Sequence, residues 1–362
     1  MKEVTIHDRK IYPGHPTYII AEMSANHNQD FHKAVKIIES AKEAGANAGK
    51  LQTYTPDTIT INCDNDYFRI KGTSWEGKSL YELYGEAYTP WEWQPKLKKI
   101  ANDLGMDLFS TPFDHTAVDF LEKMDVPAYK VASFELLDLP LLRKIAQTGK
   151  PIIMSTGMAT LAEIDEAVSA IREAGGSQLA LLKCTSAYPA PADEMNLRTI
   201  PHLADAFGVP VGLSDHTLGI AVPVAAVALG ACIIEKHFTL SRQNPGPDSA
   251  FSLEPCEFKE MVDAIRTTEN ALGEVSYEIT EKQKVSRVFR RSLFVVKDVK
   301  KGEEFTEENI RSIRPGYGLH TRCLDQIIGR KAKVFIKKGT PLDWNLIVLK
   351  KNQKNMAHRG LA

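Results

Sequence analysis

The chain has 362 residues, which is too many for a single small hydrophobic core, so we expect two domains. Its 45 Lys and Arg residues nearly balance its 46 Asp and Glu residues, which argues against a general nucleic-acid-binding surface. The five cysteines are widely spaced and form no CxxC pair, so they indicate neither a zinc knuckle nor a disulfide framework. The sequence shows no signal-peptide pattern and no apolar run of membrane-spanning length, so we expect a cytoplasmic protein without a membrane partner.

Short apolar runs of β type alternate with amphipathic helical patterns from residue 17 onward. Eight strands that alternate with helices over roughly 250 residues are typical of a (β/α)8 TIM barrel in the α/β class. A doubly wound sheet is the competing fold, but no Gly-rich phosphate turn follows the first strand. We therefore predict a barrel whose strands are residues 18–23, 48–54, 107–113, 128–134, 151–156, 179–185, 209–215 and 232–238.

Segments outside this repeat complete the expected domain organisation. Residues 4–12 alternate apolar and polar and predict a hairpin at the bottom of the barrel. Residues 55–88 form a long insertion on the face where barrels keep their active sites, so they are a candidate lid. We expect the barrel domain over residues 1–276, a linker over 277–291, a small β-rich domain over 292–350 with strands near 293–296 and 333–335, and a polar tail over 351–362.

Two of the predicted strands end on a histidine, His216 and His237. Between them, residues 218–230 are rich in small residues and suit one packed helix. Because consecutive parallel strands place their C-terminal ends side by side, we expect the two imidazoles to converge. Two histidines and a carboxylate suit Mn²⁺, Fe²⁺ or Zn²⁺, although two hydrogen-bonded structural histidines would give the same pattern.

Lys50 and Lys130 lie in apolar runs where a barrel interior ordinarily carries Val, Ile or Leu. Burial of an unpaired ammonium is unfavourable, so each lysine either pairs with Glu22 or Glu135 or binds an anion. Backbone amides of residues 155–157, at the expected head of the fifth helix, would add donors for such an anion. The lining that a phosphate-plus-carboxylate ligand requires is completed by hydroxyl groups at strand ends: Thr111, Ser133, Ser155, Ser186 and Ser214.

A metal beside an anion site, with an acid such as Glu22, suits carbonyl activation and C–C bond formation. A Schiff-base aldolase that uses Lys50, Lys130 or Lys183 is an alternative from the same residues. Its mechanism needs one desolvated lysine and no metal, so it leaves the histidine pair without a role.

Eight motifs follow the predicted strands in order: residues 21–27, 50–53, 110–113, 128–133, 155–158, 184–189, 212–216 and 235–238. Together they resemble the sialic acid synthase family, and the small β-rich domain resembles the antifreeze-like (SAF-type) domain of that family. Residues 70–77, 80–84 and 314–320 resemble the pseudaminic acid synthase branch. Ser186 stands where N-acetylneuraminate synthases tend to carry Asn, which argues against an N-acetylmannosamine substrate.

The resemblance implies that phosphoenolpyruvate condenses with an N-acylated sugar aldehyde and water. The expected sugar is 2,4-diacetamido-2,4,6-trideoxy-L-altrose; N-acetylneuraminate and legionaminate synthases, or a non-catalytic carbohydrate-binding protein, are the alternatives. By resemblance His216 and His237 hold a divalent metal, Mn²⁺ or Mg²⁺, Glu22 transfers protons and Glu135 supports it. The implied phosphoenolpyruvate ligands are Lys50, Thr111, Lys130, Ser133, Ser155, Ser186 and Ser214, and the implied sugar ligands are Tyr188, Asp248 and, from the swapped C-terminal domain of a homodimer partner, Arg314.

Overall fold

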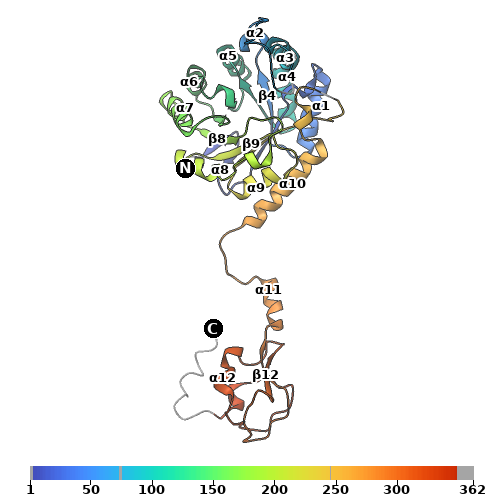
Figure 1. The fold of residues 1–362 in the computed structure, drawn as a ribbon, viewed down its shortest axis with the longest axis vertical. Helices are drawn as coiled ribbons and strands as arrows, with labels where there is room; N and C mark the ends of the chain where they lie inside the picture. Colours follow the sequence, from blue (N-terminus) through green and yellow to red (C-terminus); the bar gives the residue numbers. More distant parts are fainter. Residues whose placement is uncertain (1–2, 73–75, 245, 349–362) are drawn as a thin grey trace. The chain divides into compact units, whose positions relative to one another are not determined.

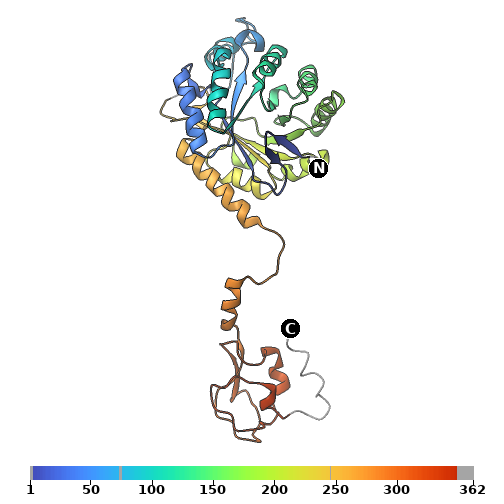
Figure 2. The same ribbon diagram turned by 180° about the vertical axis from the view of Figure 1, so that it is seen from behind.

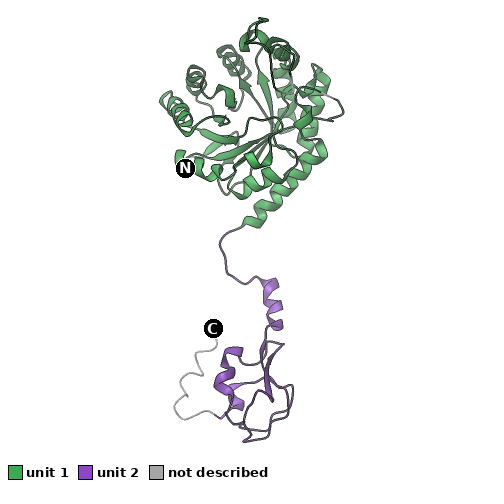
Figure 3. Cartoon of the chain, viewed as in Figure 1, with its two compact units in different colours: residues 1–273 green, residues 274–362 purple. Residues whose placement is uncertain are grey.

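The structure is a computed structural model that describes residues 3–72, 76–244 and 246–348. The chain divides into two compact units, residues 1–273 and 274–362, each with its own hydrophobic core (Figure 3). The tail predicted over residues 351–362 lies outside the described residues. Among the described residues, no helix combines the length and the apolar character needed to cross a membrane.

Eight parallel strands of the first unit close into a barrel in the order β10-β3-β4-β5-β6-β7-β8-β9 (Figure 1). The predicted TIM barrel is therefore confirmed, and every barrel strand lies within its predicted limits. The first and last strands pair in register, so that His237 lies opposite Glu22. The strands are β3 (Tyr18–Glu22), β4 (Ala48–Thr53), β5 (Asp107–Pro112), β6 (Tyr129–Val131), β7 (Ile152–Ser155), β8 (Leu179–Cys184), β9 (Val211–Asp215) and β10 (Ile233–His237).

Helices surround the barrel and bury one apolar face each against it (Figures 1 and 2). Helix α1 shows why: its buried residues Ala34, Ile37, Ile38 and Ala41 recur at helical spacing, and the Asp30 side chain caps its first turn. The helices of this layer are α1 (Phe31–Glu43), α4 (Gln94–Asp103), α5 (His115–Met124), α6 (Leu139–Gln147), α7 (Leu161–Glu173), α8 (Thr199–Phe207), α9 (Ala221–Ala228) and α10 (Pro255–Leu272).

The predicted N-terminal hairpin is present as β1 (Val4–Ile6) and β2 (Arg9–Ile11). It lies at the N-terminal end of the barrel, because Arg9 donates to the carboxylate of Asp107, the first residue of β5, over 2.6 Å. The Tyr18 hydroxyl donates to the same carboxylate over 2.7 Å. These contacts fix the closed end of the barrel and leave the opposite rim for function.

The insertion after β4 contains two short helices, α2 (Pro56–Ile59) and α3 (Leu80–Ala87). The segment that leads from the insertion back to the barrel is anchored near β4, because the Trp91 indole donates to the Tyr54 carbonyl over 3.1 Å. The Tyr54 and Tyr84 rings meet edge to face with centroids 5.5 Å apart. The insertion is thus attached at the carboxyl end of β4, where a candidate lid was expected.

In the second unit, β11 (Ser292–Val295) and β12 (Ile310–Ile313) pair antiparallel, and α12 (Leu324–Ile327) follows. The segment interpreted as a linker contains the helix α11 (Glu281–Ser286). The strand predicted at residues 333–335 is wrong: single β-bridges flank this segment, and its apolar side chains Val334 and Phe335 are exposed instead of packed.

Candidate functional site

Lys50 and Glu235 form a buried ion pair inside the mouth of the barrel. The Lys50 Nζ atom lies 2.8 Å from Glu235 Oε1 and 3.0 Å from Glu22 Oε2. Burial alone lowers the pKa of Lys50, but the negative charges of Glu22 and Glu235 outweigh it and raise that pKa above its ordinary value. Lys50 is therefore a permanently charged ammonium at the centre of the site.

Lys130 is the second buried cation of the site. Its ammonium donates to Ser155 Oγ over 2.7 Å and to the Val131 carbonyl over 2.8 Å, and it lies 3.9 Å from Glu235 Oε1. Burial lowers the pKa of Lys130 to about 8. Glu22 and Glu135 were the expected structural partners of the two lysines. Glu22 does pair with Lys50, but among the described residues the carboxylate that pairs with Lys130 is Glu235.

Glu235 is a site residue that the sequence reasoning placed at a strand end without giving it a role. It contacts both lysines, and Ser214 donates to its Oε1 atom over 3.4 Å. The available signal was strand alternation: Glu235 lies two residues before His237, so both side chains share one face of β10.

Glu22 and Asp248 are joined by a short hydrogen-bonded chain. The Gln52 amide donates to Glu22 Oε1 over 3.0 Å and to Ser24 Oγ over 2.9 Å. The Ser24 hydroxyl in turn donates to Asp248 Oδ2. Burial raises the pKa of Glu22 to about 7, although Lys50 opposes the shift, and burial also raises the pKa of Asp248. Glu22 and Asp248, which were both expected in the site, therefore belong to one network. The sequence analysis assigned no role to Gln52 and Ser24, the two residues that link them.

The hydroxyls of Ser133 and Ser186 converge above the end of β7. The Gly157 amide donates to Ser133 Oγ over 3.0 Å, and a Cβ atom on Gly157 would lie 2.2 Å from Ser186 Oγ. Thr111 lies opposite Gln52 in the β4–β5 pairing, and its Oγ1 atom is buried without a hydrogen-bond partner among the described residues. These hydroxyls form a donor-rich lining with Ser155 and Ser214, in which Thr111, Ser155 and Ser214 are buried and Ser133 and Ser186 are half-buried.

One part of the expected anion site is wrong. The amides of residues 155–157 do not head a helix, because helix α7 begins at Leu161 and the Thr160 side chain caps it. The Thr156 amide donates to the Leu182 carbonyl over 2.9 Å. The loop after β7 therefore brings no helix N-terminus to the site, although its Gly157 amide donates to Ser133 Oγ.

The predicted convergence of the two histidines is confirmed. The ring centroids of His216 and His237 are 5.4 Å apart, and Tyr188 stacks on His216 with centroids 4.3 Å apart. The Phe251 ring covers His237 at 4.9 Å. Aromatic rings therefore pack beside both imidazoles and restrict their orientation.

The two histidines fit a divalent metal. His216 Nδ1 lies 3.0 Å from the Thr185 carbonyl, and with the proton on Nδ1 its Nε2 atom keeps a lone pair for a metal. His237 Nδ1 is buried and has no hydrogen-bond partner in the described chain. Burial lowers the pKa of His237 well below its ordinary value, which favours the neutral, ligating form. In the described ranges, however, no group of three His, Cys, Asp or Glu side chains forms a complete metal site.

Glu135 and Arg314, two further expected site residues, take no part in the hydrogen bonds and ion pairs described above. Burial raises the pKa of Glu135 to about 7, and its Oε2 atom has no hydrogen-bond partner among the described residues. Arg314 is exposed and belongs to the second unit, where it follows β12.

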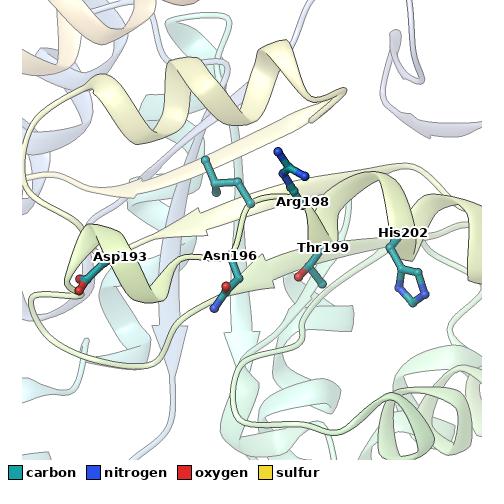
Figure 4. A pocket seen from close by; sticks show the side chains of 6 residues that line it. Asp193, Asn196, Arg198, Thr199 and His202 are labelled. Atoms are coloured by element: carbon teal, nitrogen blue, oxygen red, sulfur yellow. The ribbon is translucent and has the colours of Figure 1, made fainter.

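A separate hollow of about 510 Å³ lies at the start of α8 (Figure 4). It contains none of the expected site residues and no buried charged group. Its lining consists of Asp193, Asn196, Leu197, Arg198, Thr199 and His202.

The chain is similar over most of its length to proteins of known activity. Pseudaminic acid synthase of Helicobacter pylori is 48% identical over 328 residues, which cover 90% of this chain and 96% of that protein. N,N'-diacetyllegionaminic acid synthase of Legionella pneumophila is 37% identical over 335 residues, covering 91% of this chain and 94% of that protein. The crystal structure of N-acetylneuraminic acid synthetase from Leptospira borgpetersenii in complex with citrate has a TM-score of 0.70 at 33% identity and covers 79% of this chain and 95% of that one.

The family matches fall on both units. Residues 37–277 match the NeuB family, and residues 290–348 match the SAF domain. The resemblance to the sialic acid synthases is therefore confirmed. The chain belongs to the NeuB family and carries a SAF domain.

Proposed function

We propose that this chain condenses phosphoenolpyruvate with 2,4-diacetamido-2,4,6-trideoxy-L-altrose and water to give pseudaminic acid and phosphate. The observation that carries the proposal is the pair of buried ammonium groups, Lys50 and Lys130, beside two convergent histidines. The choice of sugar rests on the 48% identity to pseudaminic acid synthases, against 37% to the Legionella legionaminic acid synthase.

The anion half of the site suits phosphoenolpyruvate. Its phosphate and carboxylate need several donors, and charge-assisted hydrogen bonds from Lys50 and Lys130 are the strongest that the site offers. The unpartnered hydroxyl of Thr111 supplies one more donor. We place the ligand against these groups and the hydroxyls of Ser133, Ser155, Ser186 and Ser214.

The second half suits the sugar aldehyde. His216 and His237 would hold a divalent metal, Mn²⁺ or Mg²⁺, which when bound supplies Lewis-acid polarisation of a carbonyl. Tyr188 packs against this pair, and Asp248 is joined to Glu22 through Ser24 and Gln52; both would contact the sugar. Glu22 is the candidate for proton transfer, because a pKa of about 7 lets it both accept and release a proton near neutral pH. Glu135 would support it as a second acid.

The proposal includes a homodimer in the cytoplasm, where Arg314 of one copy reaches the sugar of the other copy. It is supported by the exposed guanidinium of Arg314 and by the planar, permanently charged fork that such a group offers to a sugar N-acyl oxygen. The two copies would then each contribute residues to both sites.

A phosphate-release assay tests the proposed function. Purified chain, Mn²⁺ and phosphoenolpyruvate are incubated with a panel of 2-acetamido and 2,4-diacetamido hexoses, and released phosphate is measured. We expect release that depends on the hexose and is fastest with the 2,4-diacetamido-L-altrose sugar. Fastest release with an N-acetylmannosamine or a gluco-configured diacetamido sugar would move the assignment to neuraminate or legionaminate synthesis. Absence of release with every sugar would favour a non-catalytic carbohydrate-binding protein.

A further inference from the structure

A second buried ion pair lies directly behind the two histidines. Asp215 precedes His216, and Lys236 precedes His237, so both charged side chains point to the face of the sheet opposite the imidazoles. The Lys236 Nζ atom lies 2.5 Å from Asp215 Oδ2, and both side chains are 0% exposed. The two residues are also direct partners in the β9–β10 pairing.

The pair closes the turn that presents His216. Asp215 Oδ1 accepts a hydrogen bond from the Thr217 amide over 2.9 Å. The Lys236 ammonium also donates to the Thr217 carbonyl. Lys236 therefore contacts Asp215 and Thr217, the residues on either side of His216, and it directly precedes His237 in the sequence.

A buried ion pair is weak evidence for a stabilising role. Replacement of a buried ion pair by neutral side chains of similar volume is often neutral or stabilising, because desolvation of two charges offsets their attraction. A contact that does not maximise stability and that ties together two ligand-bearing segments is instead suited to positioning. Partners behind metal ligands commonly alter metal affinity ten- to a hundredfold when removed.

We propose that Lys236 and Asp215 are positioning residues that hold His216 and His237 at a separation suited to one divalent metal. The inference rests on the proposed function, since it assumes that this histidine pair is the metal site. Neither residue touches the metal or a substrate: both act through the backbone of the turn at residues 215–217 and through strand β10.

Titration with Mn²⁺, followed by the electron paramagnetic resonance signal of the free ion, tests the inference without any turnover. We expect Lys236→Met to weaken Mn²⁺ binding about ten- to a hundredfold. Arg9→Met is the matched control, because it removes one cation from the buried carboxylate of Asp107 at the opposite end of the barrel. This control should lower thermal stability and leave Mn²⁺ affinity unchanged.

A double variant, Asp215→Asn with Lys236→Met, separates positioning from stability, and it serves if Lys236→Met does not fold. It leaves no unpaired buried charge, and the introduced carboxamide keeps an oxygen for the Thr217 amide. We expect a folded protein that still binds Mn²⁺ at least about tenfold more weakly than the unsubstituted chain. Mn²⁺ affinity equal to that of the unsubstituted chain, in either variant, would overturn the inference alone. Absence of Mn²⁺ binding by the unsubstituted chain would overturn the proposed metal site together with it.

Discussion

Glu235 Oε1 lies 2.8 Å from Lys50 Nζ, within a site where both side chains are buried. The same carboxylate lies 3.9 Å from Lys130, so one negative charge stabilises two ammonium groups away from water. An anionic ligand that enters the site meets donors that are already charged and held in place. The free energy of its binding should therefore depend steeply on each lysine.

Lys130→Met tests this dependence. The variant removes one charge-assisted hydrogen bond to phosphoenolpyruvate, worth about 1.5–3 kcal/mol, so we expect its KM for phosphoenolpyruvate to rise about ten- to a hundredfold. The KM for the sugar should change far less. Lys144→Met is the control, because Lys144 pairs with Asp119 on the outer helices, 2.7 Å away. An unchanged phosphoenolpyruvate response in Lys130→Met would assign that lysine a structural role.

Gly157→Ala tests the convergence of the serine hydroxyls. The added methyl group would lie 2.2 Å from Ser186 Oγ and 2.7 Å from Ser133 Oγ, so both side chains must move. We expect the KM for phosphoenolpyruvate to rise by roughly tenfold or more, as for the loss of one hydrogen bond to an anion. In the control Gly85→Ala, the methyl group meets only Pro56 at 3.8 Å, and the KM should not change. Steady-state kinetics at saturating sugar distinguish the two variants.

The barrel was predictable because its signals are local. Each strand is a short apolar run, and His216 and His237 end two consecutive runs, so parallel pairing alone brings them together. Of the lysine partners, Glu22 was expected and pairs with Lys50 over 3.0 Å, but Glu235 was not predictable in this way. Glu22, Glu135 and Glu235 all stand at strand ends, and only the register and tilt of the closed barrel bring Glu235 to Lys50 and Lys130.

In the small domain, a local signal predicted a strand that the described part of the structure does not contain. Val334 and Phe335 place a β-branched and an aromatic side chain in a row within a polar setting, a pattern that predicts a strand. The domain instead obtains its order from a core that includes Leu293, Val299 and Phe305, with single β-bridges between loops. Propensity in so short a run is overridden by the packing of the rest of the domain.

Glu135 should make stability pH-dependent. Burial raises the pKa of Glu135 from 4.5 to about 7, so the folded chain binds this proton more tightly than the unfolded chain does. Its contribution to the free energy of unfolding is fully present below pH 4.5 and is lost as the pH rises through 7. We expect at most about 3 kcal/mol from this one group.

Chemical denaturation of the unsubstituted chain and of Glu135→Gln, repeated between about pH 4.5 and 8, measures this contribution. The glutamine side chain of the variant does not titrate, so the difference between the two unfolding free energies should fall with rising pH by the amount expected for one carboxyl group. Two curves that run parallel over the whole range would show that Glu135 has an ordinary pKa.

Removal of either histidine should abolish metal binding and nearly all activity. In His216→Ala and His237→Ala a nitrogen ligand is lost together with the ring contact to Tyr188 or Phe251, whereas the apolar core of the barrel is unchanged. We expect folded variants with a lower melting temperature and no measurable Mn²⁺ binding. His202→Ala is the control, since His202 is exposed on α8 (Figure 4). Full activity after EDTA treatment, with no metal detected in the protein, would contradict the prediction.

Arg314 and His216 provide a test of the proposed swap, because they belong to different compact units of the chain. Chains carrying His216→Ala and chains carrying Arg314→Ala should each be inactive alone. In a mixed dimer, the intact barrel of the Arg314→Ala chain would receive Arg314 from its partner. With equal mixing and free exchange, half of the dimers are mixed and each has one complete site, so about a quarter of full activity should return. A mixture of His216→Ala and His237→Ala chains is the control and should stay inactive, because both changes lie in the same unit. Demonstrated subunit exchange without recovery in the first mixture would mean that each chain completes its own site.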